Sequence, residues 1–80
     1  MTIGIIGGLG HRAGAAFYQE LIARTSVAEE RRHLPVVLVS DPALPDRIAH
    51  LDGRGPSPLP GLTAMVRRLE VAGAQLICIA

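Results

Sequence analysis

The sequence predicts a parallel α/β domain with a three-stranded open sheet and flanking helices. Three short, nearly unbroken apolar runs are typical of strands buried on both faces: Ile3–Ile6, Val36–Ser40 and Leu76–Ala80. They alternate with two segments, near residues 12–25 and 57–72, whose apolar residues recur at helical spacing. Because strands that alternate with helices form parallel sheets with right-handed crossovers, we expect the three runs to lie side by side.

The composition is that of one small globular domain. Of the 80 residues, 49% are apolar and 19% are charged, which favours a folded core over disorder. A chain of this length buries only about 60 to 65% of its unfolded surface, so we expect marginal stability. The first residues, Met1–Gly8, include neither a basic segment nor a long apolar stretch. We therefore expect a cytoplasmic protein that does not bind a membrane.

The charged and cysteine residues argue against several classes of ligand. Net charge is +1, and the eight basic residues, all arginines, are scattered along the chain. With Phe17 and Tyr18 as the only aromatic residues, we expect no nucleic-acid partner. Cysteine and histidine spacing is not that of a metal site. The one cysteine, Cys78, is interpreted as a core residue of the third strand rather than a nucleophile.

The first predicted helix follows a glycine-rich loop, Gly7–Gly10. Its apolar stripe, expected to face the sheet, comprises Gly14, Phe17, Tyr18, Leu21 and Ile22. The charged residues 27–33 are expected to form a frayed helix end or a solvated connection to the second strand, which Pro35 precedes.

Residues 41–60 are rich in proline and glycine, which predicts a long loop with room for one helical turn at Asp46–Leu51. A long loop within a small domain is usually functional. Ser57 and Pro58 then predict the start of the second main helix, and Gly73 its end. The apolar stripe of this helix is expected to comprise Leu59, Leu62, Met65, Val66, Leu69 and Ala72.

Candidate site residues follow the carboxyl ends of the strands, where ligands bind in open parallel sheets. Loop Gly7–Arg12 could present backbone amides to a carboxylate or phosphate, or could be a tight turn. Its Gly8–Ala13 segment also matches the G-x-G-x-x-A dinucleotide pattern, with Asp41 as the acidic partner. Asp41 lies about thirty residues after the glycines, where about twenty is usual, and Pro42 follows it. A Rossmann-type nucleotide-binding module is therefore the alternative interpretation.

Arg47 is a further candidate, because it follows Pro45 and Asp46 in a rigid segment at the same edge of the sheet. A guanidinium can hold a carboxylate through two parallel hydrogen bonds. The competing interpretation is a surface arginine paired with Asp46 or Asp41. His11, at the start of the first helix, could act as an acid or base or be simply exposed to solvent.

Three segments together resemble the aspartate/glutamate racemases that work without a cofactor. Ile3–Gly10 resembles the opening of aspartate racemases, Asp41–Arg47 resembles their arginine-bearing loop, and Leu69–Ala80 resembles the helix and strand that precede their first catalytic cysteine. The match spans nearly the whole chain in the same order. The resemblance implies that residues 1–80 are a partial amino-terminal domain of such a racemase, and half of a flavodoxin-like racemase domain.

The same resemblance implies a function and its residues. Members of the family interconvert L- and D-aspartate or glutamate without pyridoxal phosphate: one cysteine thiolate removes the α-proton and a second thiol protonates the opposite face. By position, Arg47 would bind a substrate carboxylate, and Gly8, Leu9 and Gly10 would line the pocket. The implied ligand is a small acidic amino acid, with no cofactor and no metal. Family members often dimerise, so a homodimer is an expectation.

Two departures from the family pattern bear on this interpretation. Leu9 and His11 stand where family members commonly have methionine and proline. The Cys-Asn-Thr motif with the first catalytic cysteine would begin directly after Ala80, and Cys78 aligns with neither catalytic cysteine. We therefore expect a truncated domain that is inactive alone. A noncatalytic fragment that associates with another chain through its third strand is a further alternative.

Overall fold

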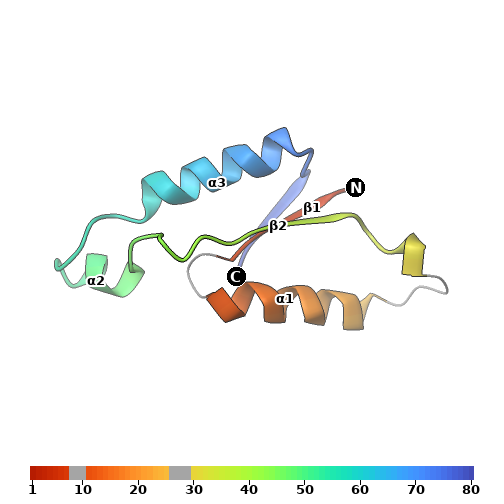
Figure 1. Ribbon diagram of the computed structural model, residues 1–80, viewed down its shortest axis with the longest axis horizontal. Coiled ribbons are helices and arrows are strands. Elements are labelled where there is room, and N and C mark those ends of the chain that lie inside the picture. Colours follow the sequence, from red (N-terminus) through yellow and green to blue (C-terminus); the bar gives the residue numbers. More distant parts are fainter. Residues whose placement is uncertain (8–10, 26–29) are drawn as a thin grey trace.

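The structure is an open, three-stranded parallel sheet flanked by helices (Figure 1). This computed structural model describes residues 1–7, 11–25 and 30–80. The strands are β1 (Ile3–Ile6), β2 (Val36–Val39) and β3 (Leu76–Ile79), in the order β2-β1-β3. The predicted fold class is confirmed, and the last strand is a neighbour of the first.

The central strand β1 pairs in parallel with both neighbours. Its residue Ile5 lies opposite Leu38 of β2 and Cys78 of β3. At the amino end of the sheet, Ile3 N donates a hydrogen bond to Pro35 O at 2.9 Å, which extends the pairing with β2. All four residues of β1 are buried, as expected for a strand with neighbours on both sides and helices on both faces.

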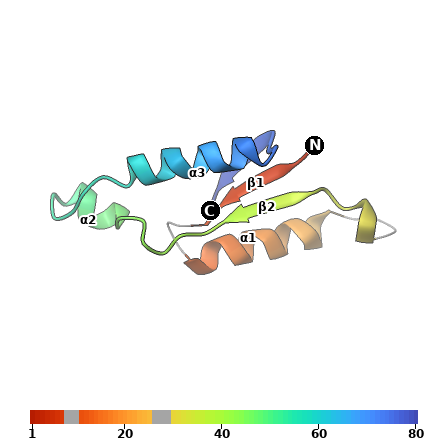
Figure 2. The ribbon, with the colours of Figure 1, turned by 45° about the horizontal axis from the view of Figure 1, so that its top comes forward.

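The helices are α1 (His11–Arg24), the short 3-10 helix η1 (Glu30–Arg32), α2 (Arg47–Leu51) and α3 (Leu59–Val71). α3 covers one face of the sheet and α1 covers the other (Figure 2). Both main helices and the helical turn after β2 start and end within two residues of the predicted positions. η1 lies within the charged segment 27–33, which was expected to be a frayed helix end or a solvated connection.

The hydrophobic core lies between β1 and α3. Ile6, Met65 and Leu69 are buried together, because residues four apart on a helix share a face. Half-buried apolar residues surround them: Val37, Val39, Leu62, Val66, Ala74 and Ile77. Gly4 permits the close approach of α3, since a Cβ at this position would lie 3.0 Å from Leu69 Cδ1.

α3 starts and ends near the predicted residues, but the two end residues of its predicted apolar stripe are not buried. Pro58 is the N-cap, and Ser57 Oγ accepts a hydrogen bond from Leu59 N at 3.1 Å. Gly73 has a φ of +93°, a left-handed conformation that favours glycine and ends the helix. Leu59 and Ala72, the ends of the predicted apolar stripe, are exposed. The reason is length: about 20 Å of helix lies on strands about 13 Å long.

The sheet face covered by α1 is less completely shielded. Ile3 and Ile5 are buried there, and a Cβ on Gly14 of α1 would lie 2.8 Å from Gly7 Cα. The predicted stripe of α1 is wrong for three residues, which are 37%, 39% and 47% exposed: Phe17, Tyr18 and Ile22. Three strands span only about 10 Å, so side chains away from the centre of the stripe extend past the sheet.

We expect Gly14→Ala to lower the free energy of unfolding by about 1 kcal/mol. The added Cβ would meet backbone, and overpacking costs about 1–3 kcal/mol against a gain of about 1 kcal/mol in helix propensity. Gly61→Ala is the matched control, because its Cβ would meet a side-chain methyl of Leu44, which can move. Urea denaturation measures both variants. A Gly14→Ala chain as stable as the wild type would contradict the close approach.

Candidate functional site

The carboxyl ends of the three strands lie at one edge of the sheet, which we call the carboxyl edge. The residues that directly follow the strands are Gly7, Ser40 and Ala80. Gly7 N donates to Val39 O at 2.8 Å, and Ala80 N donates to Ile6 O at 2.9 Å. The start of α1 lies at this end of the sheet, and α2 projects beyond it (Figure 1). The segments predicted to form the site therefore leave the sheet side by side.

Gly7 is fixed at the carboxyl edge by contacts from β2 and α1. It is buried, and a Cβ at this position would lie 3.1 Å from Gly14 Cα. Ser40 Oγ donates a hydrogen bond to Gly7 O at 3.0 Å, across 33 positions of sequence. This bond joins the exits of β1 and β2. Sequence reasoning missed Ser40, because a lone serine after a strand belongs to no pattern.

The predicted pocket-lining residues Gly8, Leu9 and Gly10 lie outside the described residues, as does the side chain of His11. Their roles therefore stay predictions. What the structure places is the residue from which this loop starts, Gly7, and the helix that follows the loop, α1.

Two aspartates in the segment after β2 accept hydrogen bonds from nearby backbone amides. Asp41 Oδ1 accepts from Ala43 N at 2.9 Å, and Asp46 Oδ1 accepts from Ile48 N at 2.9 Å. Asp46, with an extended backbone, is thereby the N-cap of α2. Such a carboxylate satisfies an amide that the helix itself leaves without an acceptor.

Arg47 is the first residue of α2, and its side chain is exposed. Among the described residues, Arg47 forms no ion pair with either Asp41 or Asp46, so the structure does not show the surface pairing that was the competing interpretation. In the same segment Arg54 does form an ion pair, with Asp52 at 2.9 Å. The Arg47 guanidinium thus stands on an element that projects beyond the carboxyl edge (Figure 1).

Local hydrogen bonds, rather than burial, hold α2 in place. None of its residues is buried, and Ile48 and Leu51 are 59% and 77% exposed. After the helix, Arg54 N donates to Ala49 O at 2.8 Å, which folds the chain back onto α2. The position of Arg47 therefore depends mainly on the cap and on these turn hydrogen bonds.

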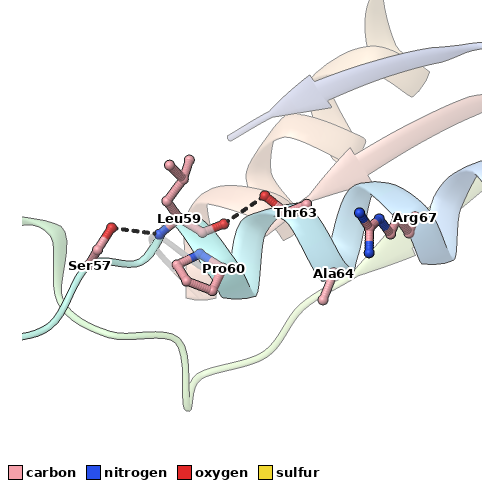
Figure 3. A pocket seen from close by; sticks show the side chains of 6 residues that line it. All are labelled: Ser57, Leu59, Pro60, Thr63, Ala64 and Arg67. Atoms are coloured by element: carbon pink, nitrogen blue, oxygen red, sulfur yellow. Dashed lines mark hydrogen bonds between the residues drawn. The ribbon is translucent and has the colours of Figure 1, made fainter.

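Arg47 lines none of three surface depressions formed by described residues. The largest of the three, about 500 Å³, lies at the start of α3 (Figure 3) and is lined by Ser57, Leu59, Pro60, Thr63, Ala64 and Arg67. The Ser57 and Thr63 hydroxyls both form hydrogen bonds with the backbone of Leu59. Polar groups that converge on a ligand are typical of binding sites, and here two of the three polar side chains are engaged by the helix itself.

Residues 1–7, 11–25 and 30–80 contain neither a metal-binding cluster nor a membrane-spanning helix. Within these ranges no three histidine, cysteine, aspartate or glutamate residues are placed to hold a metal ion together. Nor does any helix in the same ranges combine the length and apolar character needed to cross a lipid bilayer.

The sheet order and the carboxyl edge define the chain as an open, parallel α/β domain. No protein-family model matches the sequence. Among solved structures, the chain is similar to Picrophilus torridus aspartate racemase, with a TM-score of 0.84 and 34% sequence identity. The match covers 99% of this chain and 54% of that chain, so the chain spans about half the length of the racemase that it matches. The predicted resemblance to aspartate racemases is confirmed.

We expect Asp46→Ala to unfold α2 locally while leaving the sheet intact. Loss of an N-cap acceptor costs about 0.5–2 kcal/mol, and α2 has no buried residue to compensate. The Cα chemical shifts of residues 47–51 should therefore move towards random-coil values in NMR spectra. Asp46→Asn keeps an acceptor oxygen and serves as the control with retained helical shifts. Identical shifts in the wild type and the alanine variant would show that the cap is dispensable.

Proposed function

We propose that this chain is part of a cofactor-independent racemase that interconverts the L and D forms of aspartate or glutamate. The observation that carries the proposal is the similarity to Picrophilus torridus aspartate racemase, at 34% identity over 99% of the chain. In this proposal residues 1–80 belong to the amino-terminal domain of a cytoplasmic, homodimeric enzyme. Its ligand is a small acidic amino acid.

Arg47 binds a substrate carboxylate in this proposal. Its guanidinium is exposed at the start of α2 and makes no ion pair with the neighbouring Asp41 or Asp46, so its donors can turn to a ligand. A guanidinium matches a carboxylate through two parallel, charge-assisted hydrogen bonds. Such a pair fixes the orientation of the amino acid as well as its position.

The loop of Gly8, Leu9 and Gly10 lines the same pocket in this proposal. It connects Gly7, which is fixed at the carboxyl edge, to α1. The amino terminus of a helix favours a nearby negative charge, and glycines allow a ligand to approach the backbone closely. A second carboxylate of the substrate is a suitable partner for this loop.

The proton transfers require two thiols that these 80 residues do not supply. Their one cysteine, Cys78, is half-buried within β3, opposite Ile5 of the central strand. We therefore assign the transfers to cysteines outside these residues. One thiolate takes the α-proton, the second thiol donates a proton to the opposite face, and Arg47 stabilises the negative charge that develops between the two steps.

In the longest natural protein that contains this chain, we expect Arg47→Ala to lower kcat/KM for racemisation by the equivalent of about 2–4 kcal/mol, because a buried charge pair with the substrate is lost. Arg54→Ala is the matched control, since it removes the same charge from the same segment, where Arg54 pairs with Asp52. Polarimetry of L-aspartate and L-glutamate solutions follows the reaction. Unchanged kcat and KM in Arg47→Ala would remove this residue from the site.

The purified 80-residue chain should not exchange the α-proton of aspartate for deuterium, because it has neither of the two required thiols. Proton NMR of the aspartate α-hydrogen in D₂O measures the exchange over time. The longer natural protein is the positive control under the same conditions. Thiol-dependent exchange by the 80 residues alone would show that the assignment of the proton transfers is wrong.

A further inference from the structure

Ser40 stands where the two segments of the proposed site leave the sheet. It directly follows β2 and directly precedes the segment 41–54 that includes Arg47. Its hydroxyl donates to Gly7 O at 3.0 Å, and Gly7 is the first residue of the glycine loop, residues 7–10. One hydrogen bond therefore joins the start of the glycine loop to the start of the arginine-bearing segment.

The bond completes a set of restraints on Gly7. Val39 O accepts the Gly7 amide at 2.8 Å, and the Gly7 Cα is packed against Gly14. The Ser40 hydroxyl engages the one backbone group that remains, the carbonyl. Because a peptide unit is planar, the direction of this carbonyl sets the plane of the peptide bond by which the chain leaves Gly7.

We propose that Ser40 is a positioning residue for the racemase reaction: its hydrogen bond fixes Gly7, from which the chain enters the proposed pocket loop, relative to the exit of β2, from which the arginine-bearing segment starts. This inference rests on the proposed function. A substrate with two carboxylates must be held at two points at once, and a misplacement of about 1 Å between such points can cost about 100-fold in rate. Ser40 acts through Gly7 and does not itself touch the substrate.

A bond of the same chemical kind occurs elsewhere in the chain and provides a control. Thr63 Oγ1 donates to Leu59 O at 2.9 Å, within a single helix (Figure 3). That bond links residues four positions apart, whereas the Ser40 bond links the exits of two strands. Removal of the Thr63 hydroxyl therefore tests the loss of a hydroxyl-to-carbonyl bond without a change at the carboxyl edge.

The experiment compares Ser40→Ala, Ser40→Thr, Ser40→Val and Thr63→Val in the longest natural protein that contains this chain. Steady-state kinetics are measured with aspartate and glutamate. Ser40→Ala should lower kcat/KM by about five- to tenfold, mainly through a higher KM, as expected when one hydrogen bond that orients a binding loop is lost. Ser40→Thr should recover activity to within about twofold, and Thr63→Val should match the wild type.

Each other outcome has a defined meaning. A KM in Ser40→Ala equal to that of the wild type, with or without a lower melting temperature, would overturn the inference and leave Ser40 a purely structural role. If Ser40→Ala fails to fold, Ser40→Thr is compared with Ser40→Val instead, because threonine and valine have the same shape and differ in the hydroxyl donor. Equal KM values for these two variants would overturn the inference. A wild-type protein that racemises neither substrate would refute the proposed function itself, before any variant is compared.

Discussion

The structure depends on the pairing of β1 with a parallel strand on each side. Parallel pairing brings the carboxyl ends of all three strands to one edge, so segments far apart in sequence leave the sheet as neighbours. Ile5 and Ile6 are completely buried on opposite faces of this strand, beneath α1 and α3. The strand that organises the sheet is therefore also the one that anchors both helices.

Glycines set the distance between the layers at two points. Gly4 admits the side chain of Leu69 on the α3 face, and Gly7 lies against Gly14 of α1 at the carboxyl edge. The second contact has a functional consequence, because it fixes the residue from which the glycine loop starts. Ser40 adds a hydrogen bond to the same point, and the exits of β1 and β2 become one unit.

The segment after β2 is built on a different principle. α2 has no buried residue, and the Asp46 cap and nearby backbone hydrogen bonds define it. An element with few buried contacts can shift without disturbing the core, which suits a group that must meet a substrate. Asp41 and Asp46 both accept backbone amides, and among the described residues Arg47 forms an ion pair with neither of these acidic neighbours. The sequence predicted Arg47 at this edge but did not distinguish a substrate carboxylate from Asp41 or Asp46 as its partner.

The sequence by itself determined the elements and their order, because strand and helix periodicity follow from local backbone geometry. Ile3–Ile6 was predicted with the observed bounds, and Gly73 marked a helix end that needs a left-handed residue. Only the tertiary structure decided which apolar residues are covered: Phe17 fits the helical stripe yet is exposed, because a narrow sheet cannot reach it. Only the tertiary structure also showed the hydrogen bond between Ser40 and Gly7. These residues are 33 positions apart in the sequence, and the pairing of β1 with β2, which no local sequence pattern reveals, brings them together.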